Sequence, residues 1–162
     1  MNEKKRERTK KLFKDELMDL CMKKEFIDIT VKELCENVGL NRSTFYLYYT
    51  DINELLRDIS SEMRSVIGEI ARGFSSFRVP SSEAEVSRDL VYTKQSMLEA
   101  VKYSRYLIPL LENRAGRSFS VWYEKETYNT FVDSLKQEHI EITPAIEALA
   151  GDKGSELGTG GM

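Results

Sequence analysis

The sequence predicts an all-α protein with an N-terminal three-helix unit and a C-terminal helical bundle. Its 162 residues include only 3 prolines, and the stretches between them are rich in Leu, Glu, Lys and Met, which favour helix. Apolar residues recur there at intervals of three and four, which is the spacing of one helix face. No segment shows a convincing strand pattern, so we expect helices throughout.

Composition is that of an ordinary globular protein, because 41% of the residues are hydrophobic and 31% are charged. The sequence contains no run of 18 apolar residues, so it predicts no membrane span. The charged N-terminal segment has no apolar stretch behind it, which argues against a signal peptide. We therefore expect a cytoplasmic protein without membrane contact.

Charge is distributed unevenly along the chain. Residues 1–14 carry seven Lys or Arg against two Glu, whereas residues 51–162 carry 13 basic and 18 acidic side chains. A basic end on an acidic body suits a chain whose N-terminus meets a polyanion. The alternative is a solvated N-terminal turn of helix, and charge alone does not separate the two.

Residues suited to catalysis or metal binding are scarce. Cys21 and Cys35 have no histidine cluster nearby, so we interpret them as small buried hydrophobes. His139 stands alone, and no nucleophile–base pair, metal cluster or pair of carboxylates has a recognisable spacing. We predict no catalytic residues, no metal and no cofactor, and hence not an enzyme.

Two short predicted helices meet at a tight turn around Gly39. Thr30 and Glu33 have the spacing of a capping box at the start of the first. Glycine adopts the left-handed conformation most easily, so Gly39 is suited to end that helix. Asn41 can cap a second helix over residues 42–48. This layout is typical of a helix-turn-helix.

Side chains around the turn are expected to divide between two faces, with an earlier helix over residues 4–24 completing the unit. Phe45 and Tyr49 lie four residues apart and face the core. In a helix-turn-helix the start of the second helix lies nearest the base edges. Arg42 can donate two hydrogen bonds to guanine, and outward tyrosines can reach phosphates. The candidate DNA-binding residues are Thr30, Lys32, Asn41, Arg42, Ser43, Thr44, Tyr46 and Tyr48.

The remainder predicts a helical body. We expect helices over residues 51–72, 83–112 with a kink near Pro109, and 119–138, and then a short helix over 143–150. Pro80 lies in the linker before Ser82, which pairs with Glu85 as a cap. The predicted division is residues 1–50 for DNA binding, 51–150 for effector binding and dimerisation, and 151–162 as a disordered tail.

Large rings are frequent in this body, and two interpretations stay open. They form either the core and a dimer surface, with Trp122 and Tyr123 as anchors, or a small-molecule pocket. No ligand-binding residue is assigned. The charged residues Glu99, Lys102, Arg105 and Glu112 are expected to form a solvated helix face.

Residues 8–60 resemble the DNA-binding domain of the tetracycline-repressor-like (TetR) family, and in particular its Firmicutes-type branch. The resemblance rests on "TVKELCENVGLNRSTFYLYYTDINELL", with a Thr-capped helix, a glycine turn, a polar run and an aromatic-Tyr-x-aromatic-aromatic pattern. It implies a homodimer on a palindromic operator, with a ligand or partner bound by the C-terminal domain. It adds Leu47 to the DNA-contacting positions. Ile52 departs from the family pattern, which commonly has a phosphate-binding lysine there, and the chain after residue 140 is shorter in helix than the family's dimerising end.

The predicted function is therefore a sequence-specific DNA-binding transcriptional regulator, in the first instance a homodimeric repressor of double-stranded palindromic DNA, with a small molecule or partner acting at the C-terminal domain. The alternative is a helical protein-interaction module or a partner-dependent co-activator of the same fold, with weak or lost DNA binding. Ile52 and the acidic pI of 5.4 favour that alternative.

Overall fold

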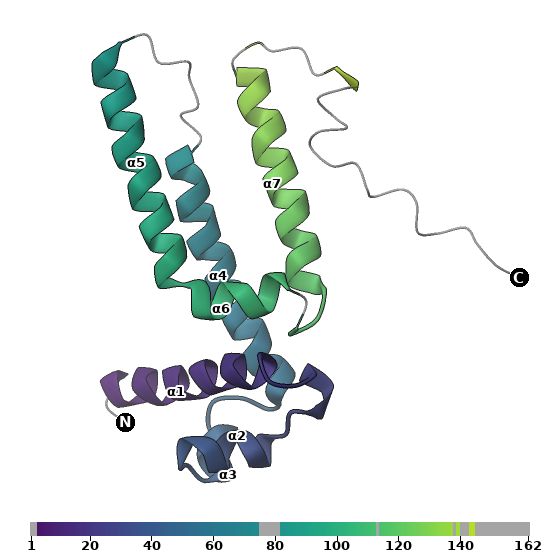
Figure 1. Cartoon of the computed structure of the whole chain (residues 1–162). Coiled ribbons are helices and arrows are strands. Elements are labelled where there is room, and N and C mark those ends of the chain that lie inside the picture. Colours follow the sequence, from purple (N-terminus) through teal and green to yellow (C-terminus); the bar gives the residue numbers. More distant parts are fainter. Residues whose placement is uncertain (1–2, 75–81, 113, 138, 140–142, 145–162) are drawn as a thin grey trace, which may run out of the picture.

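The chain is all-helical, as a computed structural model shows for residues 3–74, 82–112, 114–137, 139 and 143–144 (Figure 1). No strand occurs among these residues. The predicted all-α class is confirmed. The helices are α1 (Glu3–Cys21), the short 3-10 helix η1 (Phe26–Asp28), α2 (Val31–Val38), α3 (Arg42–Tyr46), α4 (Ile52–Phe74), α5 (Glu83–Lys102), α6 (Ser104–Leu111) and α7 (Ser118–Gln137).

The helices form two layers that α4 connects. Figure 1 shows α1 lying across the molecule with α2 and α3 beneath it, while α4, α5 and α7 rise above. We call α1, α2 and α3 the lower layer, and the helices above them the upper layer. α1 contacts α2, α4 and α6, and α5 packs beside α4. α6 runs across the base of the upper layer, where it also contacts α7. The lower layer is therefore joined to the upper one through both α4 and α6.

A continuous apolar core runs from the lower layer into the upper one. Phe13 and Leu17 of α1, Phe45 of α3 and Ile59 of α4 are fully buried. The same cluster of buried residues continues through Met63 and reaches α6 and the start of α7. Because α4 contributes to the core over most of this path, the division at residue 50 stays a prediction.

The helix predicted over residues 83–112 is in fact two helices. The chain breaks at Tyr103 (φ −98°, ψ 7°), before Pro109, which lies buried inside α6; the kink near Pro109 itself stays a prediction. The change of direction at Tyr103 brings Leu107 and Leu110 into the core. Packing of α6 on α1 and α4 thus accounts for the break, whereas the proline sits within the helix that results.

The remaining elements follow the sequence pattern closely. α5 begins as predicted, since the Ser82 hydroxyl accepts a hydrogen bond of 3.3 Å from the Glu85 N–H. α7 starts one residue earlier than predicted and is helical to Gln137; the predicted last residue, 138, lies outside the described residues. Most of the predicted linker before Ser82, most of the predicted helix over 143–150 and the predicted disordered tail lie outside the described residues.

Candidate nucleic-acid interface

The start of α2 is capped by Thr30, whose extended backbone (φ −115°) precedes the helix. Its hydroxyl accepts a 3.2 Å hydrogen bond from the Glu33 N–H, as predicted. The Glu33 carboxylate does not complete a capping box; it binds the Lys24 ammonium instead. The ion pair takes the place of the second hydrogen bond of the predicted capping box, from the Thr30 N–H to the Glu33 carboxylate. It also connects the start of α2 to the end of the preceding turn.

Gly39 ends α2 in the left-handed conformation (φ 67°, ψ 32°). The Gly39 N–H bonds to the Glu36 carbonyl and the Leu40 N–H to the Cys35 carbonyl, at 3.2 and 2.9 Å. This pair of bonds is the Schellman motif, which satisfies the carbonyls left open at a helix end. No other group lies near the place of a Cβ atom, so the backbone angle alone explains the glycine.

α3 follows after two residues and is shorter than predicted, since it ends at Tyr46. Asn41 has the extended backbone of an N-cap residue, but its side chain makes no capping hydrogen bond. The predicted capping role of the Asn41 amide is therefore wrong, and the exposed amide is available to other partners. Beyond α3, the N–H groups of Tyr48 and Tyr49 still bond to the Phe45 carbonyl.

Two aromatic residues hold α3 against the rest of the lower layer, as predicted. Phe45 is fully buried and meets Phe13 of α1 edge to face, with ring centroids 5.3 Å apart. Tyr49 is 3% exposed, and its hydroxyl donates a 2.8 Å hydrogen bond to Asp58 of α4. Burial first, and this bond second, raise the pKa of Tyr49 far above its ordinary value.

The nine candidate DNA-binding residues surround this anchored pair. Tyr46 and Leu47 are 57% and 69% exposed, while Thr44 and Tyr48 are half-buried. Tyr48 packs partly against the core, so the prediction that it points outward is met only in part. Thr30, Lys32, Asn41, Arg42 and Ser43 are exposed. Lys32 lies 3.8 Å from Glu36, one turn further along α2.

The basic N-terminal segment contributes less free charge than its composition suggests. Lys14 lies 3.1 Å from Asp58 and 2.7 Å from Glu62, and Lys10 lies 3.7 Å from Asp58. Although burial disfavours the charged form, hydrogen bonds from Tyr49 and Lys14 hold the pKa of Asp58 below its ordinary value. These lysines therefore join α1 to α4. Further toward the N-terminus, Lys5, Arg6 and Arg8 are exposed and pair with no carboxylate among the described residues.

The start of α4 shows why a cation is missing at Ile52. Ile52 is half-buried and packs against the core. Asp51 accepts a 2.7 Å hydrogen bond from the Glu54 N–H, and the Glu54 carboxylate accepts bonds from the N–H and hydroxyl of Thr50. These bonds from Thr50 lower the pKa of Glu54. Acidic groups cap this helix, so it offers negative rather than positive charge at its first turn.

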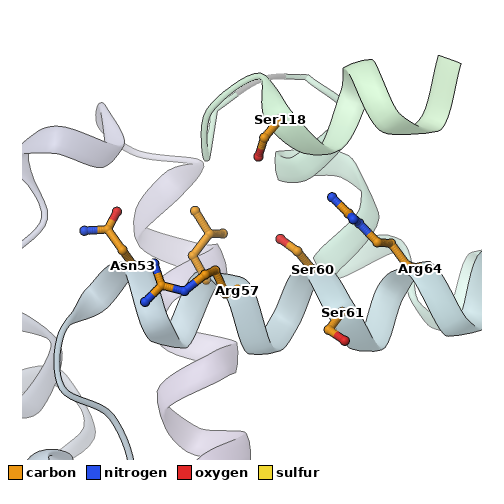
Figure 2. A pocket seen from close by; sticks show the side chains of 7 residues that line it. Asn53, Arg57, Ser60, Ser61, Arg64 and Ser118 are labelled. Atoms are coloured by element: carbon orange, nitrogen blue, oxygen red, sulfur yellow. The ribbon is translucent and has the colours of Figure 1, made fainter. Parts of the chain in front are cut away.

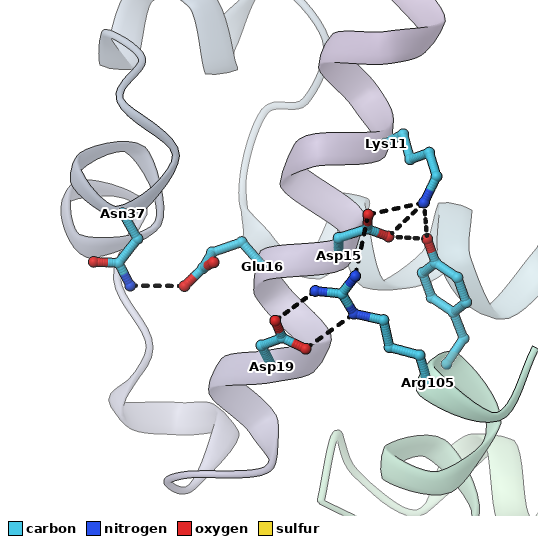
Figure 3. A network of polar contacts seen from close by, with 7 residues as sticks. Lys11, Asp15, Glu16, Asp19, Asn37 and Arg105 are labelled. Atoms are coloured by element: carbon cyan, nitrogen blue, oxygen red, sulfur yellow. Dashed lines mark hydrogen bonds and ion pairs between the residues drawn. The ribbon is translucent and has the colours of Figure 1, made fainter.

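A polar network links the lower layer to α6 (Figure 3). Arg105 of α6 binds Asp19 of α1 through two nitrogens, one of them at 3.0 Å, and lies 3.4 Å from Asp15. Lys11 and the hydroxyl of Tyr106 also donate hydrogen bonds to Asp15. The expectation that Arg105 belongs to a solvated helix face is met only in part, because the side chain is exposed but the network also binds it to α1.

Other contacts extend the network or contrast with it. Asn37 near the end of α2 donates a 2.7 Å hydrogen bond to Glu16 of α1. Figure 3 shows Glu16 on the side of α1 opposite to Arg105. Among the described residues, the carboxylate partner of Lys102 is Glu99 on its own helix, and Glu112 pairs with Arg114. These exposed pairs fit the predicted solvated face.

The two cysteines are free and buried. Burial raises the pKa of the Cys21 thiol to about 11, and that of Cys35 in the same direction. A thiol with such a pKa is a poor nucleophile near neutral pH. Both residues therefore serve as core side chains, as predicted.

The aromatic residues of the C-terminal part divide into two groups. Phe119 is buried, and Trp122 and Tyr123 pack against the core while remaining half-exposed. Tyr92 and Phe131 are exposed. A hollow of 470 Å³ lies elsewhere, between α4 and the start of α7, and its lining includes Arg57, Ser60, Arg64 and Ser118 (Figure 2). Sequence reasoning missed this hollow, because residues from distant segments form it.

Comparison with known proteins adds one partial match. No family model matches the chain, and no solved structure matches it. A stretch of 40 residues is 58% identical to part of glutamate 5-kinase 2 from Bacillus licheniformis, which covers 25% of this chain and 11% of that protein. The chain thus spans about a tenth of that relative's length, and a match of this extent assigns neither a family nor an activity. Each helix within the described residues is too short or too polar to cross a bilayer.

Proposed function

We propose that the chain is a sequence-specific DNA-binding transcriptional regulator of the TetR type, in which α2, the turn at Gly39 and α3 form a helix-turn-helix. One observation carries the proposal. The exposed run Asn41–Ser43 begins a short helix that is held from behind by buried Phe45 and Tyr49. Side chains on such a helix are presented outward on a fixed support, which is what a base-contacting helix needs.

The chemistry of the exposed residues suits the two kinds of contact that DNA offers. Arg42 can form a bidentate pair with guanine, and Ser43 and Thr44 can bond to either base edge or phosphate. Tyr46 extends from the same short helix, and Thr30 and Lys32 lie at the start of α2, where they suit phosphate contacts that orient the protein. Leu47 offers an apolar contact for a thymine methyl.

A homodimer is part of the proposal because the DNA is expected to be palindromic. Two copies would present their α3 helices about 34 Å apart, one turn of DNA. The exposed apolar side chains of α5 support this assembly, since a monomer rarely leaves so many on one helix uncovered. Binding of a small molecule or partner to the upper layer would then be transmitted through α4 and through the network between α6 and α1.

Substitution of Arg42 tests the proposed base contact directly. Arg42→Ala should weaken binding to the preferred duplex by about 1–3 kcal/mol, because one bidentate base contact is lost. The measurement is a titration of labelled duplex at fixed salt. Arg114→Ala is the matched control, since Arg114 is an exposed arginine beyond α6 paired only with Glu112, and it should bind DNA as the parent does.

The duplex for this titration is obtained by selecting bound sequences from random double-stranded DNA. The proposal expects a palindrome with half-sites one DNA turn apart. Absence of binding at micromolar protein in low salt would refute it, as would equal losses in the Arg42 and Arg114 variants.

A second candidate function is supported by the start of α4. Ile52, Asp51 and Glu54 give this turn an apolar and acidic character instead of a phosphate-binding cation. A protein-interaction module or partner-dependent co-activator of the same fold would tolerate that change, because its partner supplies the DNA affinity. Such a protein would bind the selected duplex only together with its partner and would keep its partner affinity in Arg42→Ala.

A further inference from the structure

Seven residues line the hollow between α4 and the start of α7; six of them have polar side chains and the seventh is Leu56, and carbon atoms form more of the lining surface than polar atoms do. Asn53, Arg57, Ser60 and Arg64 follow one another at intervals of four, three and four residues, so they share one face of α4. Ser118, the first residue of α7, faces them from the other side, as Figure 2 shows. Two guanidinium groups, an amide and hydroxyls thus surround a space of 470 Å³.

Positive charge in this hollow is not neutralised by the described residues. Neither Arg57 nor Arg64 lies within ion-pair distance of a carboxylate there, in contrast to Lys14 and Arg105. Glu54, one turn before Arg57, is occupied by hydrogen bonds from Thr50. Both arginines are exposed. An anion entering the hollow would therefore meet two cations that form no ion pair with a carboxylate among these residues, although Arg57 interacts with the negative charge of Glu54.

One of the two arginines is held in position by the upper layer. The guanidinium carbon of Arg64 lies 4.9 Å from the centre of the Trp122 ring, a cation–π contact. Trp122 in turn packs against buried Phe119, with ring centroids 5.4 Å apart. Figure 2 shows Arg64 leaning toward Ser60, so its charge is directed into the hollow.

The other arginine, Arg57, lies at the opposite end of the hollow. Arg57 is exposed, and in Figure 2 its side chain extends toward Asn53. The Cα atoms of Arg57 and Arg64 are separated by about 10 Å along the helix axis, given a rise of about 1.5 Å per residue. A rotation about the side-chain bonds of Arg57 would bring both guanidinium groups to one ligand above Ser60.

We propose that this hollow binds a small molecule through a phosphate or carboxylate group. Arg64, Ser60 and Ser118 form the fixed side of the site, and Arg57 turns in to complete it. Arginine suits this role because its planar fork of N–H donors matches both kinds of oxyanion. The volume is in the range of small-molecule sites. The proposal does not depend on DNA binding, since it rests on α4 and α7 alone.

Calorimetric titration of the DNA-free full chain with inorganic phosphate and with citrate, in low-chloride buffer, tests the proposal and distinguishes the two chemistries. Saturable binding of either probe is expected in the calorimeter. In a parallel NMR titration, the backbone amide resonances of residues 57–64 and 118–122 should shift. Arg57→Gln should raise the dissociation constant at least about tenfold, because a charge-assisted hydrogen-bond donor is lost without altering the contact with Trp122. Arg64→Lys, which keeps the charge, should bind more tightly than Arg64→Gln.

Lys125→Gln is the matched control, because it removes an exposed cation of α7 that does not line the hollow and should leave anion binding unchanged. Failure of both probes to bind saturably would overturn the proposal, and so would equal weakening by the Lys125 and Arg57 variants. If Arg57→Gln weakened only binding to duplex DNA and had no effect on either probe, the hollow would be a DNA-backbone contact and the proposal would be wrong. Failure of the DNA selection described above would leave the result of this titration unaffected.

Discussion

Large apolar side chains are buried in the lower layer but exposed on α5. In the lower layer, Phe13, Leu17 and Phe45 are fully buried against neighbours from the same chain. On α5, Leu90 and Met97 are 64% and 61% exposed. The lower layer therefore completes its core within one chain, whereas α5 carries apolar surface that its own chain does not cover within the described residues.

The spacing on α5 sharpens this contrast. Leu90, Met97 and Val101 are separated by seven and four residues, so they form one stripe along the helix. Val101 is 70% exposed, yet it lies only two residues before Tyr103, where the chain turns into α6 and becomes buried again. Folding stability should thus depend on the lower layer, and association on α5.

The largest expected effect is on folding, at Phe45. Phe45→Ala should lower the free energy of unfolding by about 3–5 kcal/mol, because it leaves a cavity between α1 and α3. Phe131→Ala on α7, where the ring is 43% exposed, should change it by less than about 1 kcal/mol. Denaturant unfolding of both variants gives the comparison, and equal losses would mean that the two layers do not differ as described.

The second expected effect is on association, through the α5 stripe. Met97→Lys should weaken self-association by about 2 kcal/mol, because a charge would be buried at a central position of the interface. Sedimentation of the variant over a range of concentrations would show a shift from dimer toward monomer. Lys94→Ala nearby is the control. An unchanged dimer in Met97→Lys would show that α5 is not the surface through which copies meet.

A smaller effect is expected at the helix cap in the lower layer. Thr30→Ala should cost about 1 kcal/mol of unfolding free energy, because the Glu33 N–H loses its acceptor. Asn41→Ala, at a cap position without a side-chain hydrogen bond, should cost clearly less. Thermal or denaturant unfolding separates them, and a larger loss at Asn41 would mean that its amide does cap α3 in solution.

A further effect appears at alkaline pH, where the contact between α6 and α1 is tested. Burial, followed by the hydrogen bond to Asp15, raises the pKa of Tyr106 from 10.0 to about 12. Its stabilising contribution is therefore complete below pH 10 and is lost as the pH rises toward 12, since the unfolded chain releases the proton first. The free energy of unfolding should decline over this window, and Tyr106→Phe should reduce the decline.

The matched variant for this titration is Tyr92→Phe, because Tyr92 is exposed on α5. It should leave the decline with pH as it is in the parent. If Tyr106→Phe also left the decline unchanged, the phenol would not be a partner of Asp15 in solution.

Features governed by neighbours in sequence could be predicted. Thr30 caps α2 through a residue three positions on, Gly39 ends it through its own backbone angle, and Phe45 and Tyr49 share a face because they are four residues apart. Each of these depends on local geometry, which spacing and residue type specify. The same holds for the all-α class and for the start of α5 at Ser82.

Features that depend on partners distant in the sequence could not be predicted. The break at Tyr103 depends on contacts of Arg105 and Tyr106 with aspartates some 90 positions earlier, and a pattern along one helix contains no information about them. Glu33 leaves its predicted cap because Lys24 lies close in space. The exposure of most candidate DNA-binding residues agrees with their predicted faces, with half-buried Tyr48 agreeing only in part, while their role in binding stays a prediction.

The pairing of Lys10 and Lys14 with carboxylates of α4 has a consequence for any polyanion that approaches α1. With Lys11 bound to Asp15, at least three of the seven cations in residues 1–14 are already paired with carboxylates of the same chain. Each phosphate neutralised on duplex DNA releases about one counterion, and balanced lysines release none. Affinity for nucleic acid should accordingly fall with added salt less steeply than the composition of the N-terminal segment suggests.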